Sequence, residues 1–303
     1  MLEIGQYRVK LTNLEKVFWP ELDLTKADLV KYYIDVGNYI LPHLRDRPLS
    51  MNPYPDGIKG KSFYQKRCPE EAPAFVERTP IYSEHKGKQI SWCLLNNLPS
   101  LVWAANRACI ELHVWFSRWQ SGGRPDFAVF DLDPAGDTGF AEVREVALMI
   151  KGLLDELGLQ AYVKTSGKTG LHLYIPIKQE YTYVSVRNFL GHIGRVIADA
   201  RPELATLEWN IEKRGSRIYI DYRQNVRGKT LAAPYSLRPV EGARVSAPIT
   251  WAELERGAVP ADFTIFNILS RLERVGDIFH DVLARRQILP EELLQPLAAA
   301  AKK

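Results

Sequence analysis

Cysteine, methionine and histidine are scarce in this chain of 303 residues, which contains three cysteines, three methionines and six histidines. No two cysteines have the CxxC spacing, which argues against a structural zinc site. Their odd number argues against a framework of disulfides, and we expect a reducing compartment.

Long apolar runs are also missing. None approaches the ~18 residues that a membrane-spanning helix needs, and residues 1–6 lack the charged and apolar regions of a signal peptide. We therefore expect a cytoplasmic protein with no membrane partner. Neither sign of charge dominates, because 40 Lys and Arg face 36 Asp and Glu. The net charge of +4 permits an anionic partner without requiring one.

The centre of the chain has the clearest periodicity. Apolar residues recur at helical spacing in 143–157 and 186–197, and short apolar strands occur at 127–130, 161–165, 171–177 and 217–221. The order strand, helix, hairpin, helix, strand predicts an α+β fold. Its helices would pack on one face of a largely antiparallel sheet, as in ferredoxin-like or RNA-recognition-like folds.

The flanking segments extend this core. Before it we expect a helix at 26–40, capped by Thr25 and ended with the help of Pro42, a short buried helix at 98–107 and a strand at 110–116. After residue 247 we expect mainly helices, at 251–256, 263–274 and 291–300. Because no low-complexity linker separates them, we expect one domain of packed parts: an N-terminal module of about 1–110, a catalytic core of 111–245 and a helical segment of 246–303.

Two carboxylates end the strand at 127–130. Asp131 and Asp133 are separated by one residue, so in a strand they project to the same face. Two like charges this close are unfavourable unless a cation lies between them or one is protonated. Hard divalent cations take carboxylate oxygens, and phosphates complete their coordination. The alternative is a pair of loop-edge aspartates that Pro134 follows as a strand terminator.

A third carboxylate, Asp221, ends the strand at 217–221. If that strand lies beside the first, three carboxylates surround two cations, as in a two-metal phosphoryl transferase. The alternative for Asp221 is an ion pair with Arg217 or Arg223.

Two further patches carry polar and basic groups. The turn at 166–170 offers Ser166 and Lys168, with His172 just beyond it, but lacks the spacing of a Walker A loop. A glycine turn can still direct backbone N–H groups at an anion; an ordinary hairpin turn and a hydrogen-bonded sheet histidine are the alternatives. In the second patch, Lys229 and Arg238 either neutralise phosphates or are solvated surface charges.

Together these motifs resemble a known family. The ordered set Asp-Leu-Asp-Pro (131–134), Ser-Gly-Lys-Thr-Gly-Leu-His (166–172), Asp-Tyr-Arg-Gln-Asn (221–225) and Ala-Pro-Tyr-Ser-Leu-Arg (233–238) is similar to the polymerase domain of bacterial ligase D. That domain belongs to the archaeo-eukaryotic primase superfamily and serves non-homologous end joining. The resemblance covers essentially the whole chain and implies the primase fold, with an RNA-recognition-like catalytic sheet packed against an N-terminal α/β module.

The resemblance also implies residue roles. Asp131, Asp133 and Asp221 match the carboxylates that bind two divalent ions, Mn²⁺ or Mg²⁺. The residues that match the nucleotide site are Ser166, His172, Arg238 and His113, with Lys229 as a further phosphate contact. Lys16 and Lys26 match the pocket for the 5′-phosphate of a gap, and Phe63 and Tyr64 match an aromatic pair on which a template base stacks. Surface lysines and a half-buried aromatic pair are the alternatives.

The implied activity is a template-directed nucleotidyltransferase that extends primers and fills short gaps at DNA ends, with a preference for ribonucleotides. Its partners would be gapped duplex with a 5′-phosphate, NTPs or dNTPs, and a DNA ligase and Ku in the same pathway at the nucleoid. Two competing hypotheses are a non-catalytic module that binds DNA ends and a primase that starts chains without a primer. Clustered acids argue against the first, because they repel DNA phosphates; the lack of a zinc-binding domain argues against the second.

Three features limit what the resemblance carries over. Pro53 stands near a position where family members often have an arginine, so the resemblance does not carry over a DNA or end-bridging contact in that loop. Lys168 receives no role, because the basic residue of the glycine turn varies in position. The Lys-x-Asp-Gly motif of a covalent ligase is absent from the sequence, and we do not expect this chain to seal nicks.

Overall fold

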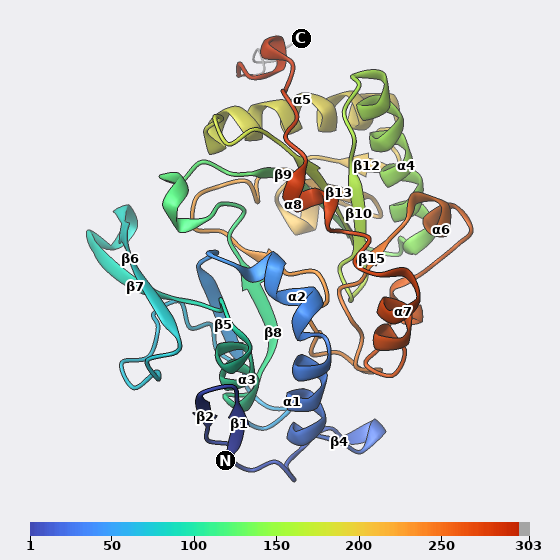
Figure 1. Cartoon of the computed structure of the whole chain (residues 1–303). Coiled ribbons are helices and arrows are strands. Elements are labelled where there is room, and N and C mark those ends of the chain that lie inside the picture. The colour runs from blue at the N-terminus through green and yellow to red at the C-terminus, as the bar shows by residue number, and fades with distance from the viewer. Residues whose placement is uncertain (297–303) are drawn as a thin grey trace.

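Two β-sheets organise the computed structural model, which describes residues 1–296 (Figure 1). The larger sheet has six strands in the order β12-β13-β9-β11-β10-β15. Its strands are β9 (Phe127–Pro134), β10 (Tyr162–Thr165), β11 (Leu171–Pro176), β12 (Ala205–Thr206), β13 (Ile218–Asp221) and β15 (Pro248–Ile249). Every pairing in this sheet is antiparallel except that of β12 with β13.

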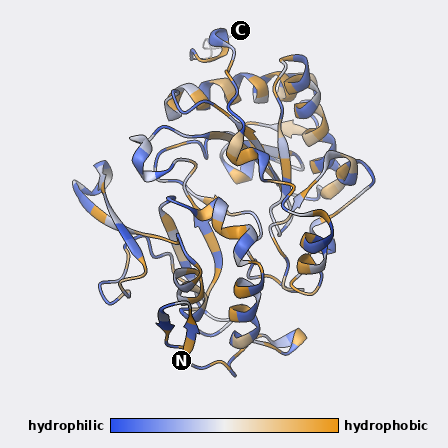
Figure 2. Ribbon diagram, viewed as in Figure 1, coloured by the Kyte–Doolittle hydropathy of each residue, from blue (hydrophilic) through white to orange (hydrophobic). Residues whose placement is uncertain are grey.

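Helices α4 (Phe140–Glu156) and α5 (Tyr183–Ala200) pack on one face of this sheet. Both are amphipathic, and hydrophobic and hydrophilic positions alternate around them in Figure 2. Thr182 caps α5 by accepting the N–H of Ser185, and Gly158, with a φ of +68°, follows the end of α4. The order β9, α4, β10–β11 hairpin, α5 and β13 confirms the predicted strand, helix, hairpin, helix, strand succession.

The second sheet has five strands in the order β14-β8-β5-β7-β6. They are β5 (Leu49–Pro53), β6 (Glu77–Ser83), β7 (Lys88–Leu94), β8 (Cys109–Val114) and β14 (Leu231–Ala232). Helices α1 (Lys26–Asp35), α2 (Gly37–Leu44) and α3 (Leu98–Asn106) pack beside it, and two small sheets complete this half: β1 (Leu2–Ile4) with β2 (Tyr7–Val9), and β3 (Val17–Trp19) with β4 (Leu24–Thr25). The module boundaries expected at residues 110 and 245 do not coincide with the division between the two sheets. Strand β8, which spans residue 110, and strand β14, which lies within 111–245, both belong to the five-stranded sheet.

The single helix predicted at 26–40 is wrong in its extent. Thr25 is the N-cap residue of α1 as expected, and its N–H and hydroxyl donate to the Asp28 carboxylate. The helix stops at Asp35, however, and α2 begins at Gly37. A Cβ atom at Gly37 would lie 2.8 Å from Leu98 Cδ1, so the first residue of α2 passes close to α3. Pro42 lies inside α2 instead of ending the first helix, and α2 ends two residues later.

A disulfide joins Cys68 to Cys93, contrary to the expectation from the odd cysteine count. The segment between β5 and β6 folds back on β7, where the Cys68 N–H donates to the Ser91 carbonyl, and this brings together two cysteines that are 25 residues apart. An odd count leaves one cysteine over, here the buried Cys109, but does not prevent the other two from pairing.

The C-terminal part is less helical than predicted. It contains α6 (Trp251–Glu255), α7 (Ile268–Val275), α8 (Asp281–Ala284) and a 3₁₀ turn at Glu291–Leu293. Residues 263–267 were predicted as helix, yet the Phe263 carbonyl accepts the Val245 N–H and the Ile265 N–H donates to Ala243. The short strand β15 was not foreseen, and residues 297–300 of the last predicted helix lie outside the described residues. Within residues 1–296, no helix has the length and apolar character to cross a membrane.

A buried ion pair joins the two sheets at one end of their interface. Arg47, just before β5, donates two hydrogen bonds of 2.6 and 2.8 Å to the carboxylate of Asp126, just before β9. The guanidinium also lies 4.4 Å from the centre of the Phe127 ring. Both side chains are almost completely buried, so neither charge has water to replace its partner.

Removing one member of this pair should destabilise the fold. Asp126→Asn would leave the Arg47 guanidinium buried and uncompensated, so we expect the free energy of unfolding to fall by about 3–5 kcal/mol. Equilibrium denaturation in urea measures this loss, with Asp199→Asn, at an exposed position of α5, as the control. A change below about 1 kcal/mol would show that the pair does not hold the sheets together.

Candidate active site

A row of ionisable residues crosses four neighbouring strands of the six-stranded sheet. Asp221 of β13 pairs with Asp131 of β9, Asp131 pairs with His172 of β11, and His172 pairs with Lys164 of β10. Directly paired residues of antiparallel strands project to the same face, so these four side chains form one line. Asp133 projects to this face too, two residues further along β9.

The opposite face of the sheet is apolar. Phe130, Leu132 and Ile220, which alternate with the aspartates, belong to the core that α4 and α5 cover. This alternation is why the strand pattern could predict that Asp131 and Asp133 share a face. The pairing of β13 with β9 then brings Asp221 beside them, as the hypothesis of three convergent carboxylates requires.

Burial and mutual repulsion dominate the electrostatics of the three carboxylates. Burial raises the pKa of Asp131 to about 6, although Lys164 and Arg238 oppose the shift. Burial together with the charges of Asp131 and Asp221 raises the pKa of Asp133 to about 7. The pKa of Asp221 is raised as well, by burial and by Asp131. The site therefore favours either protonation or a bound cation.

The chemistry of these donors fits divalent cations, which prefer carboxylate oxygen. Within residues 1–296, however, no three His, Cys, Asp or Glu side chains are grouped so that they could hold a single ion. Carboxylate oxygens suit divalent ions that complete their coordination with phosphate and water.

His172 and Lys164 continue the row away from the carboxylates. His172 Nε2 lies 3.2 Å from Asp131 Oδ1. Burial, with the charges of Lys164 and Arg238, holds the pKa of this histidine well below its ordinary value, so the ring is neutral. Lys164 is fully buried and donates to Ser246 Oγ. Sequence reasoning missed Lys164, although a lysine in an otherwise apolar strand was a visible signal.

The turn between β10 and β11 is held against the acidic strand. Ser166 Oγ accepts the N–H groups of Lys168 (3.2 Å) and Gly170 (3.0 Å), so its hydroxyl hydrogen stays available to a ligand. A Cβ atom at Gly170 would lie 2.1 Å from the Leu132 carbonyl oxygen. Only glycine permits this approach, which sets the turn beside the carboxylates.

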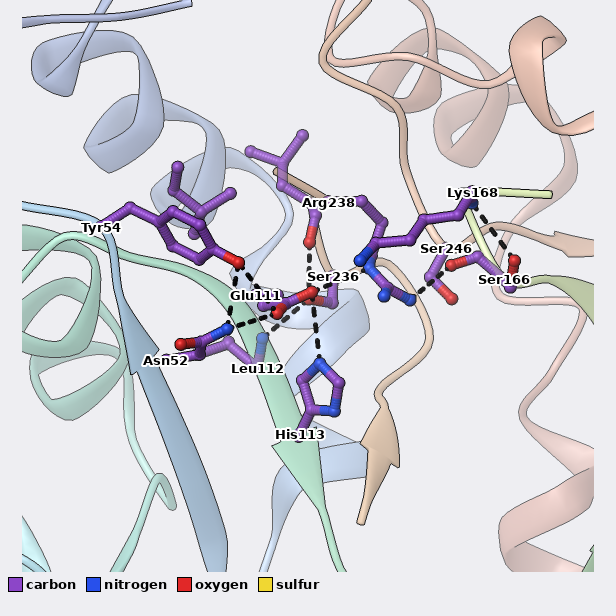
Figure 3. Close-up of polar contacts among 12 residues, drawn as sticks. Asn52, Tyr54, Glu111, Leu112, His113, Ser166, Lys168, Ser236, Arg238 and Ser246 are labelled. Carbon is purple, nitrogen blue, oxygen red and sulfur yellow. Dashed lines mark hydrogen bonds and ion pairs between the residues drawn. The ribbon is translucent and has the colours of Figure 1, made fainter. Parts of the chain in front are cut away.

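Arg238 reaches the same site from the segment after β14. Its Nε donates to Glu111 Oε2 at 3.0 Å and its Nη1 donates to the Ser166 carbonyl at 2.6 Å (Figure 3). The side chain is buried, and its positive charge offsets part of the rise in the pKa of Asp131 and Asp133. Arg238 is therefore no solvated surface charge. The charge of Lys229 likewise offsets part of the rise in the pKa of Asp131 and Asp221.

His113 and Glu111 come from β8 of the other sheet. His113 Nε2 lies 3.3 Å from Glu111 Oε2, and burial lowers the pKa of the histidine. Sequence reasoning missed Glu111, which is 1% exposed. Burial alone would raise its pKa, but the contacts with His113, Arg238 and Asn52 outweigh burial and hold the pKa below the ordinary range.

Lys16 and Lys26 line a separate pocket of about 390 Å³, together with Asn13, Phe63 and Arg107. Lys16 Nζ lies 2.5 Å from Asp56 Oδ1, and Lys26 Nζ donates to the Thr12 carbonyl at 2.7 Å. Lys26 is buried, and burial and the nearby Lys16 charge lower its pKa. Pro53 also lines this pocket, and Arg107 is a third basic residue that sequence reasoning did not select.

Phe63 and Tyr64 lie between this pocket and His113. Both rings are largely exposed, at 52% and 65%. Phe63 lines the lysine pocket, whereas the Tyr64 ring centre lies 6.2 Å from the His113 ring, edge to face. The exposed aromatic pair thus stands between the two candidate sites.

Comparison with known proteins shows which family the chain resembles over most of its length. Residues 25–279 match the model of the LigD primase-polymerase domain. The bifunctional non-homologous end joining protein LigD of Bacillus subtilis is 36% identical over 284 residues, which cover 93% of this chain and 45% of that protein. The multifunctional LigD of Mycolicibacterium smegmatis is 32% identical, over 89% of this chain and 35% of that protein. The chain thus spans less than half the length of these relatives.

A solved structure extends the similarity to the fold. The polymerase domain of Mycobacterium tuberculosis ligase D, in complex with DNA, superposes with a TM-score of 0.86 at 31% identity, over 92% of this chain and 99% of that one. The likeness confirms the predicted α+β fold and the resemblance on which the residue roles were based. The family match covers far more than half of the sequence, and the chain belongs to the LigD primase-polymerase domain family.

Proposed function

We propose that this chain is a DNA-dependent nucleotidyltransferase that extends primers and fills short gaps at DNA ends during non-homologous end joining. The observation that carries the proposal is the in-register row of Asp221, Asp131 and His172, with Asp133 beside it. We further propose a preference for ribonucleotides, action at the nucleoid in the cytoplasm, and a DNA ligase and Ku as partners in the pathway.

Asp131, Asp133 and Asp221 would hold two divalent ions, Mg²⁺ or Mn²⁺. Such ions supply the charge that lowers the pKa of a primer 3′-hydroxyl and neutralises the leaving pyrophosphate. Ser166, Arg238 and Lys229 would bind the triphosphate, because a hydroxyl and two cations face the acidic row. His172 stays neutral at working pH and would orient Asp131 through its 3.2 Å contact.

Lys16 and Lys26 would bind the 5′-phosphate on the downstream side of a gap, with Arg107 as a third cation at the pocket. Phe63 and Tyr64 would stack on a template base, which is worth about 1–3 kcal/mol per base. A module that only binds DNA ends would need this pocket alone. The buried carboxylates favour catalysis, since without cations they repel nucleic acid.

The carboxylates give the first prediction for this function. Asp131→Asn or Asp221→Asn should reduce nucleotide addition on a gapped duplex to background, while DNA binding stays the same or tightens because a negative charge is lost. Primer extension with Mn²⁺ and an electrophoretic binding assay measure the two properties. Asp137→Asn, at an exposed position in the loop after β9, is the matched control. Near wild-type extension by either site variant would refute the role of these residues.

The raised pKa of Asp133 should make the stability of the metal-free protein depend on pH. The ordinary pKa of an aspartate is about 3.9, whereas that of Asp133 in the fold is about 7. In metal-free protein, ionised Asp133 therefore costs stability that grows as pH rises from about 4 to 7 and is complete above pH 7. Asp133→Asn removes this cost, so its melting temperature without metal should exceed that of the wild type at pH 8 and approach it near pH 4.

Adding Mn²⁺ at pH 8 should reverse the order, because the wild type gains stability from the bound ions and the variant gains less. Differential scanning fluorimetry with and without a chelator measures both differences. A variant that responds to Mn²⁺ as strongly as the wild type would remove Asp133 from the metal site.

The lysine pocket should determine the preference for a phosphorylated gap. The double variant Lys16→Ala/Lys26→Ala should bind gaps with and without a 5′-phosphate equally, and its affinity should depend less steeply on salt, because two phosphate contacts are lost. Fluorescence anisotropy on the two substrates at several salt concentrations gives both quantities. Lys10→Ala/Lys31→Ala, which removes two exposed lysines of the same half, should leave the preference unchanged. A persistent preference in the first variant would exclude this pocket.

A further inference from the structure

Glu111 is a buried carboxylate with four polar neighbours and no place in the function proposed so far (Figure 3). Its Oε1 accepts from Asn52 Nδ2 at 2.6 Å and from the Tyr54 hydroxyl at 3.4 Å. Its Oε2 accepts from Arg238 Nε at 3.0 Å and lies 3.3 Å from His113 Nε2. Both oxygens are therefore fully engaged, and the carboxylate stays ionised in spite of its burial.

The Arg238 guanidinium uses two of its three nitrogens in contacts with the protein. Nε donates to Glu111 and Nη1 donates to the Ser166 carbonyl, and within residues 1–296 Nη2 has no hydrogen-bond partner. An arginine presents its five N–H donors in a rigid plane, so fixing two of the nitrogens also fixes the direction of the third. The charge of Arg238 has a lowering effect on the pKa of Asp131, Asp133 and Lys168. The fixed guanidinium plane therefore lies close to both the acidic row and the glycine turn.

The same carboxylate also connects the two sheets at the site. Glu111 belongs to β8 of the five-stranded sheet, whereas Ser166 follows β10 of the six-stranded sheet. The chain of bonds from Glu111 through Arg238 to the Ser166 carbonyl spans the interface between them. His113, two residues along β8, contacts the same Oε2 atom, so one oxygen sets the position of two basic side chains.

We propose that Glu111 is the positioning residue of the nucleotide site, and that it holds Arg238 and His113 in the orientation in which they meet the triphosphate of an incoming nucleotide. This inference rests on the proposed function. Glu111 itself touches no substrate; it acts through its two basic neighbours. Glutamine is an imperfect substitute, because the Arg238 guanidinium can only donate and pairs with the negative charge of Glu111, whereas an amide is neutral and keeps one acceptor oxygen.

The test is nucleotide binding by Glu111→Gln in the complex with gapped DNA. The probe is a nucleoside triphosphate with a non-hydrolysable α,β-methylene group, titrated in the presence of Mg²⁺. We expect its Kd and the KM of the natural triphosphate to rise by about tenfold or more, with a much smaller change in kcat. The Kd for 5′-phosphorylated gapped DNA should not change, and Glu77→Gln, an exposed carboxylate of β6, should behave like the wild type.

A double-mutant cycle separates positioning from a merely structural role. If Glu111 acts through Arg238, adding Glu111→Gln to Arg238→Ala should cause little further loss of triphosphate binding, and the two effects should be far from additive. Additive losses, or equal weakening of triphosphate and DNA binding, would overturn the proposal. A wild-type protein that binds the triphosphate without extending primers would refute the proposed function and still test Glu111. A wild-type protein that neither binds the triphosphate nor extends primers would refute both the proposed function and the role of Glu111.

Discussion

Antiparallel register around Asp131 is the constraint on which the site depends. Asp131 has a directly paired neighbour on each side, Asp221 on β13 and His172 on β11. No side chain in this row can move to the other face without shifting a whole strand by one residue, and such a shift would expose the core under α4 and α5. The hydrophobic packing of one face of the sheet therefore fixes which polar side chains project from the other face. The repulsion among the three buried carboxylates there lowers the stability of the metal-free fold.

The site is completed only where the two sheets meet. The six-stranded sheet provides the carboxylates and the glycine turn. The five-stranded sheet provides His113, Glu111 and the segment between β5 and β6 that carries Tyr64. The Arg47–Asp126 pair secures one end of the interface, and Arg238 spans it beside the acidic row. Polar contacts of this kind require specific directions. They fix how the sheets are placed relative to each other more closely than apolar packing alone.

Sequence reasoning succeeded where structure is local or strictly periodic. The shared face of Asp131 and Asp133 follows from the period of a strand, and the β10–β11 hairpin follows from its glycine turn. It failed where distant contacts decide. The Cys68 pairing depends on how a loop folds onto β7, and the importance of Glu111 appears only when Arg238 arrives from another segment. The residue roles came from family resemblance, which residue patterns alone did not supply.

The Cys68–Cys93 bond has a consequence for the exposed aromatic pair, Phe63 and Tyr64. It closes a loop of chain 25 residues long, which restricts the unfolded state by about 3–4 kcal/mol in the chain-entropy description. Phe63 and Tyr64 lie shortly before Cys68, and the Met51–Gln65 bridge is the other anchor beside them. Thiol reductants would remove the covalent tie at Cys68 and leave the Cys68–Ser91 hydrogen bond and the Met51–Gln65 bridge to hold this segment, while the carboxylates keep their register. Two preparations of identical sequence but different reductant history would then differ in how firmly the segment that carries the exposed aromatic pair is held to β7.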